Sequence, residues 1–254
     1  MLRHRVIPTL LLKNNCLFKT TRFKDPVYIG DPINAVKIFN EKEVDELILL
    51  DITATIDKRE PNYKKIEEIV SEAFMPIGYG GGINNIKQIE CLIKLGIEKV
   101  IINSAAYNNY NLIKEAAEIF GRQSIVSAID VKKDLWGKYN LYSNSGNVKQ
   151  KISIEEHIIK AVENGCGEIY MNNIDRDGTM QGYDTELIKK YSKLINVPFI
   201  ASGGAGKIHH FVEAIKSGAD AVSAGAMFVF QGVYRAVLIS YPSYDELKKL
   251  LSEV

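Results

Sequence analysis

The stretch that decides the fold is Pro198-Phe199-Ile200-Ala201-Ser202-Gly203-Gly204-Ala205-Gly206-Lys207-Ile208. It repeats an earlier stretch, residues 76–86, which begins 122 positions before it (198 − 76) and carries a glycine run at the same place. The match continues at this offset through the next helix and strand, where Ile93, Lys94, Gly96 and Val100 correspond to Ile215, Lys216, Gly218 and Val222. A repeat of this length indicates a chain built from two homologous halves, at about residues 1–122 and 123–254.

Short apolar runs alternate with stretches of helical periodicity along the chain, which is typical of parallel strands joined by crossover helices. We expect eight strands, at about residues 5–12, 47–52, 75–79, 98–103, 124–130, 168–173, 198–202 and 221–224. We expect eight helices to follow them, at about 32–43, 62–73, 85–95, 111–120, 153–164, 184–195, 207–217 and 243–252. Such an alternation predicts an α/β fold, a (β/α)8 TIM barrel.

A doubly wound open sheet would show the same alternation. The repeat favours a closed barrel, because two half-barrels that pair edge to edge leave no exposed edge strand. No linker rich in Pro, Gly or Ser separates the halves, so residues 1–254 are expected to form a single domain. Two connections are longer than the rest, residues 13–31 and 131–152. We expect both to be loops at the carboxyl ends of their strands, where barrel enzymes place active sites.

Composition narrows the classes of partner. The net charge is +1 and the charges are interspersed, which argues against nucleic acid as a partner. No secretory signal or membrane-spanning run is found, so we expect a cytoplasmic protein without a membrane partner. The three cysteines (Cys16, Cys91 and Cys166) form no CxxC, and the four histidines show no ligand spacing. We therefore predict no metal and no cofactor.

Glycines follow the third and seventh predicted strands, at residues 80–82 and 203–204. Glycine lets backbone N–H groups approach an anion closely, and a helix that begins there adds its positive dipole end. The next strands of the two halves end at residues 103 and 225, beside these glycines in a barrel. Two phosphate sites on one barrel mouth predict a small ligand with a phosphate at each end.

Asp130 closes the fifth predicted strand. A carboxylate at that end of a barrel strand is placed to move protons to and from a substrate, although it also fits a buried residue that fixes a loop. Aligning Lys132 with Lys13 in the repeat puts Leu11 at the matching position, so the second carboxylate is missing. Asp51 and Asp177 add polar groups to the same rim, and for Asp51 a structural role and a substrate contact are equally consistent.

Charged residues of both signs lie at or just before the starts of four strands. Glu46 and Glu168 correspond in the repeat, because their positions differ by 122. They can be solvated caps or can close the barrel axis as a ring of ion pairs. Since burying paired charges costs desolvation, a ring would need a role such as gating a passage. The four residues are Arg5, Glu46, Lys99 and Glu168.

With these residues in place, the chain resembles the cyclase subunit of imidazole glycerol phosphate synthase, a lyase of histidine biosynthesis, over essentially its whole length. The sister isomerase of that pathway shares the repeat and the glycines, but the Asp-Arg-Asp-Gly-Thr segment and the four charged residues favour the cyclase. The matching segments are residues 50–54, 80–83, 102–106, 128–130, 175–179, 182–184 and 201–206.

The resemblance implies a partner, a path and a substrate. A glutaminase subunit docks on the amino-terminal face of the barrel, and its ammonia passes the charged gate and crosses the interior. At the other end the ammonia reacts with a bisphosphorylated aminoimidazole carboxamide ribonucleotide. Lys19 matches a lysine that closes over the substrate, and Ser145 matches a polar substrate contact. The implied phosphate-binding residues are Gly82, Asn103 and Ser104 at one site, and Asp177, Gly203, Gly204, Gly225 and Ala226 at the other.

Two positions depart from the family. Ala226 replaces a serine, and Leu11 replaces the first of two catalytic aspartates. One carboxylate cannot readily deprotonate one atom and protonate another in the same turnover. The pattern is similar to divergent paralogues associated with acetamidino sugars of surface lipopolysaccharide, in which the barrel supplies ammonia to a separate sugar amidotransferase. A cyclase, with water, Asp51 or Asp177 replacing the lost group, and an ammonia conduit both remain open; an isomerase would rest on fold alone.

Overall fold

Aliphatic and β-branched runs form eight parallel strands that close into a barrel. The structure is a computed structural model that describes residues 4–252. Each barrel strand pairs with the next one along the chain, and the pairing of the first strand with the last closes the ring. The barrel strands are β1 (Arg5–Lys13), β4 (Leu47–Asp51), β5 (Ile77–Gly80), β6 (Lys99–Ile102), β7 (Ile125–Lys133), β10 (Glu168–Asn173), β11 (Phe199–Ser202) and β12 (Ala221–Ala224).

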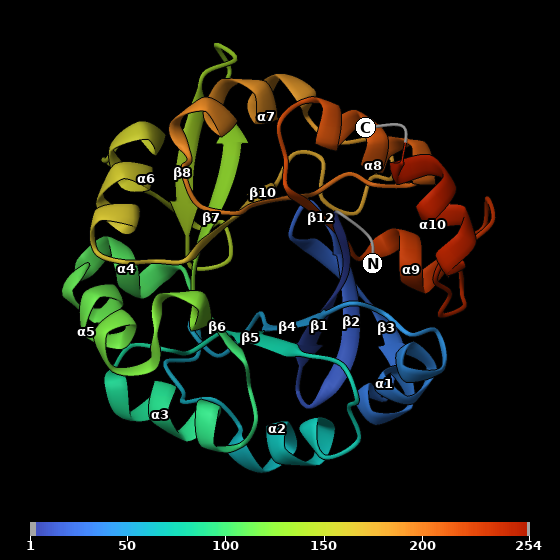
Figure 1. Ribbon diagram of the computed structural model, residues 1–254, viewed down its shortest axis with the longest axis horizontal. Coiled ribbons are helices and arrows are strands. Elements are labelled where there is room, and N and C mark those ends of the chain that lie inside the picture. The colour runs from blue at the N-terminus through green and yellow to red at the C-terminus, as the bar shows by residue number, and fades with distance from the viewer. Residues whose placement is uncertain (1–3, 253–254) are drawn as a thin grey trace.

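Helices lie outside the strands and surround them on all sides (Figure 1). Most begin at a side chain that accepts hydrogen bonds from the first turn, as Asp31, Ser153 and Ser243 do. The predicted TIM barrel is therefore confirmed. The helices that follow the barrel strands are α1 (Pro32–Glu41), α2 (Tyr63–Val70), α3 (Ile86–Lys94), α5 (Asn111–Phe120), α6 (Ile154–Glu163), α7 (Thr185–Tyr191), α8 (Ile208–Lys216) and α10 (Tyr244–Leu251).

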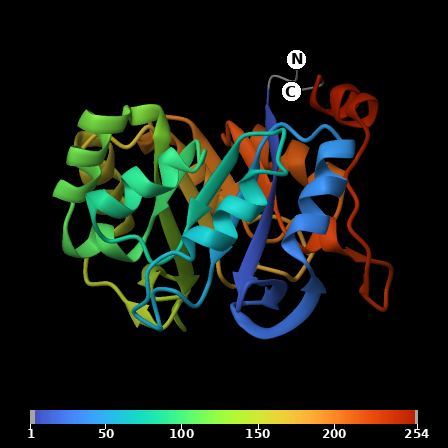
Figure 2. The ribbon, with the colours of Figure 1, turned by 90° about the horizontal axis from the view of Figure 1, so that it is seen from below.

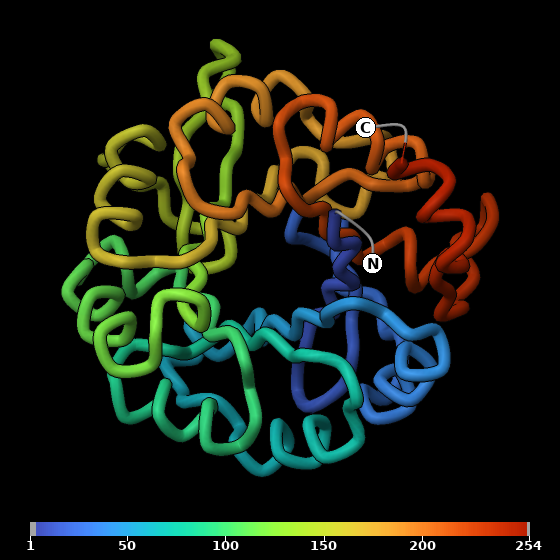
Figure 3. Tube along the Cα trace, in the orientation of Figure 1, coloured from blue at the N-terminus to red at the C-terminus, as the bar shows by residue number. Residues whose placement is uncertain are grey.

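Closure brings the two ends of the sequence together. Figure 3 traces the chain once around the ring, with its blue beginning beside its red end. The register of that seam runs from Arg5 opposite Ala221 to Pro8 opposite Ala224. The first and last strands thus contribute side chains to the same part of the barrel.

The two long connections, at residues 13–31 and 131–152, were expected to be loops. In the structure they form β-hairpins. Asn14 and Asn15 have φ values of +50° and +63° and form a two-residue turn that pairs Lys13 with Cys16. The hairpins lie at the end of the barrel to which β1 points, the lower edge of Figure 2. Their strands are β2 (Cys16–Thr21) and β3 (Lys24–Gly30), and β8 (Tyr139–Ser143) and β9 (Val148–Lys149).

Several short elements were not predicted, because they are too short to show a period. Two short helices, α4 (Ser104–Asn108) and α9 (Ala226–Val229), directly follow β6 and β12 and begin at predicted phosphate-site residues. The others are the 3-10 helices η1 (Arg122–Ser124) and η2 (Ser192–Leu194) and the hairpin of β13 (Phe230–Gln231) and β14 (Ala236–Val237).

Two hydrophobic cores follow from this architecture. The larger fills the layer between strands and helices. The smaller lies inside the barrel and includes Ile7, Ile48 and Ile101, whose strands contribute alternate side chains to the interior. Of the helices within residues 4–252, none combines the length and the apolar character that crossing a membrane requires.

Candidate functional site

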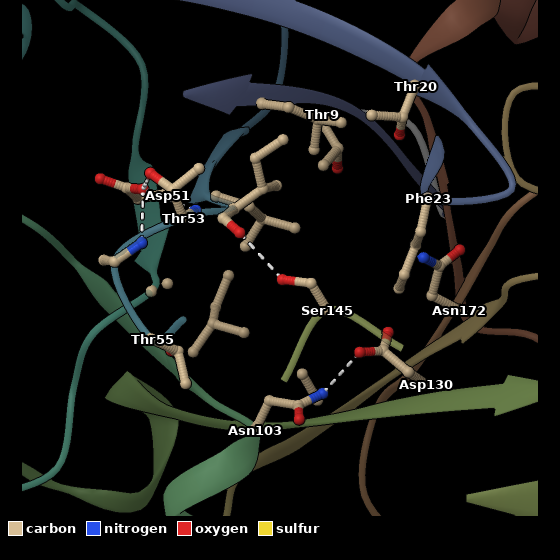
Figure 4. A pocket seen from close by; sticks show the side chains of 18 of the residues that line it. Thr9, Thr20, Phe23, Asp51, Thr53, Thr55, Asn103, Asp130, Ser145 and Asn172 are labelled. Atoms are coloured by element: carbon tan, nitrogen blue, oxygen red, sulfur yellow. Dashed lines mark hydrogen bonds between the residues drawn. The ribbon is translucent and has the colours of Figure 1, made fainter. Parts of the chain in front are cut away.

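One pocket with a volume of about 510 Å³ opens at the carboxyl ends of the barrel strands. Figure 4 shows polar side chains from both halves of the chain around it. The lining includes every residue that the sequence analysis assigned to this end of the barrel: Leu11, Lys19, Asp51, Gly82, Asn103, Ser104, Asp130, Ser145, Asp177, Gly203, Gly204, Gly225 and Ala226.

Asp130 lies on β7 and lines the pocket, and one of its carboxylate oxygens accepts a hydrogen bond. The side-chain amide of Asn103, at the end of β6, donates to Asp130 Oδ2 at 2.9 Å (Figure 4). Burial raises the pKa of Asp130 to about 7; the hydrogen bond from Asn103 opposes this shift, and the nearby charge of Asp177 adds to it. A carboxyl group with this pKa can take or give a proton near neutral pH.

Leu11 brings an aliphatic surface to the same pocket. It lies on β1 opposite Leu50 of β4, and only 8% of its surface is exposed. Its side chain has no titratable group, so Asp130 has no carboxylate partner at this position. The departure read from the repeat therefore lies inside the pocket.

Lys19 does not lie in a loop, as the resemblance implied, but on strand β2. Its ammonium group donates to both carboxylate oxygens of Asp177, at 2.9 and 3.1 Å, and both residues are buried. The Thr20 hydroxyl donates to the same carboxylate at 3.4 Å. The lysine stem covers Gly225, where an added Cβ would lie 3.1 Å from Lys19 Cε. The ion pair joins the first hairpin to the segment after β10.

The carboxylate of Asp51 is engaged within its own segment. It accepts from the backbone N–H groups of Thr53 and Ala54, both at 3.0 Å, and pairs with Arg59, whose Nη2 lies 2.7 Å from Asp51 Oδ2. A carboxylate with this many donors is held rigidly. Of the two interpretations left open for Asp51, the contacts favour the structural one, although the side chain still lines the pocket.

The two glycine runs have backbone conformations that other residues rarely adopt. Gly81 and Gly82 have φ values of +118° and +73°, and Gly203 and Gly204 have +89° and +118°. A Cβ at Gly204 would lie 2.1 Å from the carbonyl oxygen of Gly182. Next to these runs, α4 and α9 begin without a side-chain cap. Both sides of the pocket thus offer backbone N–H groups to an anion.

The second hairpin connects the two sides of the pocket. The backbone N–H of Asn144 donates to Ser104 Oγ at 3.0 Å, and the Ser145 hydroxyl donates to the Ile52 carbonyl at 2.9 Å (Figure 4). Asn144 and Ser145 hold φ values of +50° and +54° in this turn. Ser145 is therefore positioned by contact with the opposite half of the barrel.

The four charged residues at the other end form the ring of ion pairs that the sequence predicted as one alternative. Arg5 pairs with both Glu46 and Glu168, and Lys99 Nζ lies 2.9 Å from a carboxylate oxygen of each. Both glutamates are buried. Glu46 Oε1 is buried without a hydrogen-bond partner. The ring spans the barrel axis, because its members come from β1, β6 and β10 and from the residue just before β4.

Sequence reasoning missed several lining residues, among them Thr9, Thr55, Asn172 and Tyr170. Asn172 could have been found, because it lies four positions after Glu168 on one strand and side chains two or four apart share a face. The Thr55 hydroxyl accepts from the N–H of Gly82 at 3.2 Å. No group of three or more His, Cys, Asp or Glu side chains within residues 4–252 is placed to hold a metal ion.

A closed parallel barrel with its polar pocket at the carboxyl ends of the strands defines the class of (β/α)8 barrel proteins whose loops and strand ends carry the active site. The comparison with known families agrees and is more specific. Residues 5–235 match the family described as "Histidine biosynthesis protein", and the chain belongs to this family.

Curated relatives match nearly the whole chain. It is 50% identical over 248 residues to the "Putative imidazole glycerol phosphate synthase subunit hisF2" of Pseudomonas aeruginosa, covering 97% of this chain and 99% of the relative. It is 47% identical over 253 residues to the "Putative imidazole glycerol phosphate synthase subunit hisF3" of Vibrio vulnificus, covering 99% and 97%. The imidazole glycerol phosphate synthase subunit HisF of a Thermotoga species is 40% identical over 233 residues, with 92% of each chain covered.

Proposed function

We propose that this protein is the cyclase subunit of an ammonia-using lyase, similar to that of imidazole glycerol phosphate synthase. Its substrate is a bisphosphorylated aminoimidazole carboxamide ribonucleotide. One observation carries the proposal: the pocket and the charged ring occupy opposite ends of the same strands. Lys99 of the ring is the first residue of β6, and Asn103 of the pocket directly follows that strand. Glu168 and Asn172 likewise lie near the two ends of β10.

The pocket fits a ligand with two phosphates. The glycine runs lie on opposite sides of the barrel, after β5 and β11, and each adjoins an uncapped short helix. We assign one phosphate to Gly82, Asn103 and Ser104. We assign the other to Asp177, Gly203, Gly204, Gly225 and Ala226, and at this site Lys19 supplies the positive charge that balances Asp177.

Asp130 is the proton-transfer group in this proposal. Ring closure requires the loss of a proton from one atom and the gain of a proton at another, and a carboxyl group with a pKa near 7 is suited to either step. Since Leu11 supplies no second carboxylate, Asp130 must act with water or with another pocket residue. Asp51 and Asp177 are less suited to that role, because both are already paired with cations.

The ring at the amino-terminal end fits an ammonia gate. Two buried glutamates are balanced by Arg5 and Lys99, so the closed ring is neutral and excludes ions from the barrel axis. A glutaminase partner that docks on this face would deliver ammonia to the ring, and the aliphatic interior above it favours the neutral molecule. We propose a heterodimer on this basis, with the barrel retained as a single domain of two homologous half-barrels.

A second function is favoured by Leu11. A buried leucine at the catalytic position removes half of the proton-transfer pair, while the ring and the glycine runs are retained. The protein would then be an ammonia conduit that supplies a sugar amidotransferase, as in the synthesis of acetamidino sugars of surface polysaccharides. Both functions require the glutaminase partner and the passage of ammonia through the barrel interior, and they differ in what happens in the pocket.

Turnover of the bisphosphorylated ribonucleotide with ammonium salt at alkaline pH tests the cyclase directly, because it needs no glutaminase. Wild type, Leu11→Asp and the matched Leu11→Asn are compared. The cyclase proposal expects turnover in wild type that Asp130→Asn abolishes. If wild type is inactive and only Leu11→Asp gains activity, the protein is not an intact cyclase, and the conduit is favoured.

A further inference from the structure

Four hydroxyl groups meet inside the barrel, between the charged ring and the pocket. They belong to Thr9 on β1, Tyr170 on β10, Ser202 on β11 and Ser223 on β12. Thr9 Oγ1 lies 2.5 Å from Ser223 Oγ, and the Tyr170 hydroxyl lies 2.7 Å from Ser202 Oγ. The Tyr170 hydroxyl is also 3.4 Å from Thr9 Oγ1 and from Ser223 Oγ. We call these four residues the hydroxyl cluster.

The cluster occupies one wall of an interior that is otherwise aliphatic. Leu50, Ile101 and Ala128 contribute to the same interior from β4, β6 and β7, and Ile7 and Ile200 lie among them. Hydroxyl groups in such surroundings cost free energy unless they are hydrogen-bonded. The four hydroxyls lie on adjoining strands and bond one another.

Each hydroxyl of the cluster has a partner within it, but the cluster keeps unused hydrogen-bonding capacity. Four hydroxyls carry four O–H donors and about eight acceptor lone pairs. The two short contacts use two of these protons, and the remaining contacts, at 3.4 Å, are long for O–H donors. Donors and acceptors are therefore left over. Thr9, Tyr170 and Ser202 line the floor of the pocket, so a small guest can reach them.

We propose that the hydroxyl cluster binds a small neutral amine, namely ammonia on its way from the charged ring to the pocket. The inference rests on the proposed function, since either of its forms sends ammonia along this path. Ammonia has one lone pair and three N–H donors, which match the leftover O–H groups and oxygen lone pairs of the cluster.

The surroundings favour the neutral molecule over the ammonium ion. The cluster contains no carboxylate, and burial raises the pKa of the Tyr170 hydroxyl, which therefore stays protonated and uncharged. On β1 and β10 the cluster lies two positions before Leu11 and Asn172, both of which line the pocket. Ammonia held there would be the last hydrogen-bonded stop before a ligand in the pocket.

A crystal soak with methylamine at alkaline pH tests the site without any turnover. Methylamine is distinguished from water by its second heavy atom. We expect its nitrogen within hydrogen-bond distance of Tyr170 and Thr9 in wild type and absent in Tyr170→Phe, which keeps the ring and loses the hydroxyl. The matched control is Tyr183→Phe, because the Tyr183 hydroxyl is equally buried and donates to the backbone of Ser223 at 2.8 Å, outside the cluster.

A second measurement uses the complex with its glutaminase, supplied with glutamine and the bisphosphorylated ribonucleotide. Product formed per glutamate released is expected to fall about fivefold in Tyr170→Phe, the loss of roughly one hydrogen bond, and to stay unchanged in Tyr183→Phe. If methylamine avoids the cluster in wild type, or if Tyr170→Phe changes neither occupancy nor this ratio, the amine site is wrong. If methylamine binds but wild type forms no product, the cyclase fails and the amine site stands.

Discussion

The ammonium group of Lys19 and the carboxylate of Asp177 form a buried, two-pronged ion pair, with distances of 2.9 and 3.1 Å, that joins β2 to the segment after β10. It links the first half of the chain to the second at the wall of the pocket.

Removing Lys19 should therefore destabilise the fold. Lys19→Met leaves Asp177 buried without its cation, and we expect a loss of about 3 kcal/mol in the free energy of unfolding. Lys37→Met is the matched control, because Lys37 pairs with Glu72 on the surface and should cost less than about 0.5 kcal/mol. Urea unfolding of both variants measures the difference. Equal losses would show that the Lys19 pair is no stronger than a surface pair.

The glycine run after β11 should not tolerate even a methyl group. Gly204→Ala combines a φ of +118° with a Cβ placed 2.1 Å from the Gly182 carbonyl oxygen. We expect a loss of more than about 3 kcal/mol or failure to fold. Gly137→Ala also has a positive φ, of +78°, but nothing lies within 4 Å of its Cβ, and it should cost about 1 kcal/mol. Thermal unfolding of the two variants separates the clash from the backbone strain.

The raised pKa of Asp130 makes stability depend on pH. The folded-state pKa is about 7 and the ordinary value 3.8, so the ionised form is disfavoured in the folded protein. Its contribution to stability is full below pH 3.8 and is lost as the pH rises through 7. Asp130→Asn should therefore gain stability relative to wild type as the pH rises from about 4 to 8, by on the order of 4 kcal/mol. A pH-independent difference would contradict the raised pKa.

The charged ring should matter for ammonia delivered by the glutaminase and not for ammonia added from solution. Lys99→Met leaves two buried glutamates with only Arg5, so the ring becomes negative and retains ammonium ions. Glutamine-dependent product formation should fall about tenfold, while ammonium-dependent turnover stays within about twofold. Lys94→Met, on the exposed surface of α3, is the control. A parallel loss of both activities would mean that the ring is structural.

Much of the barrel could be predicted from the sequence, because the repeat marks equivalent strand ends. Gly82 and Gly204 were placed in this way, and Asp130 was placed by its position at the end of an apolar run. The hairpins were missed, although Asn14-Asn15 is a two-residue turn that favours positive φ. Their β-branched and aromatic residues lie on strands β2, β3 and β8.

Contacts across the barrel could not be predicted from the sequence, for a different reason. The partner of Lys19 depends on how β2 folds back on β1, and the meeting of Tyr170 with Thr9 depends on the register of several strands. No local pattern contains that information, since the residues lie 158 and 161 positions apart. The ring was predictable because each of its members begins or precedes a strand, which alone places them at one end of the barrel.

The number of residues between the ring and the pocket on each strand limits where insertions and deletions can be tolerated. Glu46 and Leu50, Lys99 and Asn103, and Glu168 and Asn172 are each four positions apart, and all six side chains reach the ring or the pocket. Neighbouring side chains on a strand point to opposite faces. Inserting or deleting one residue within these spans would therefore turn the side chains at one end of the strand out of the barrel. Single-residue insertions and deletions should therefore survive selection in the hairpin turns and be eliminated from these strands.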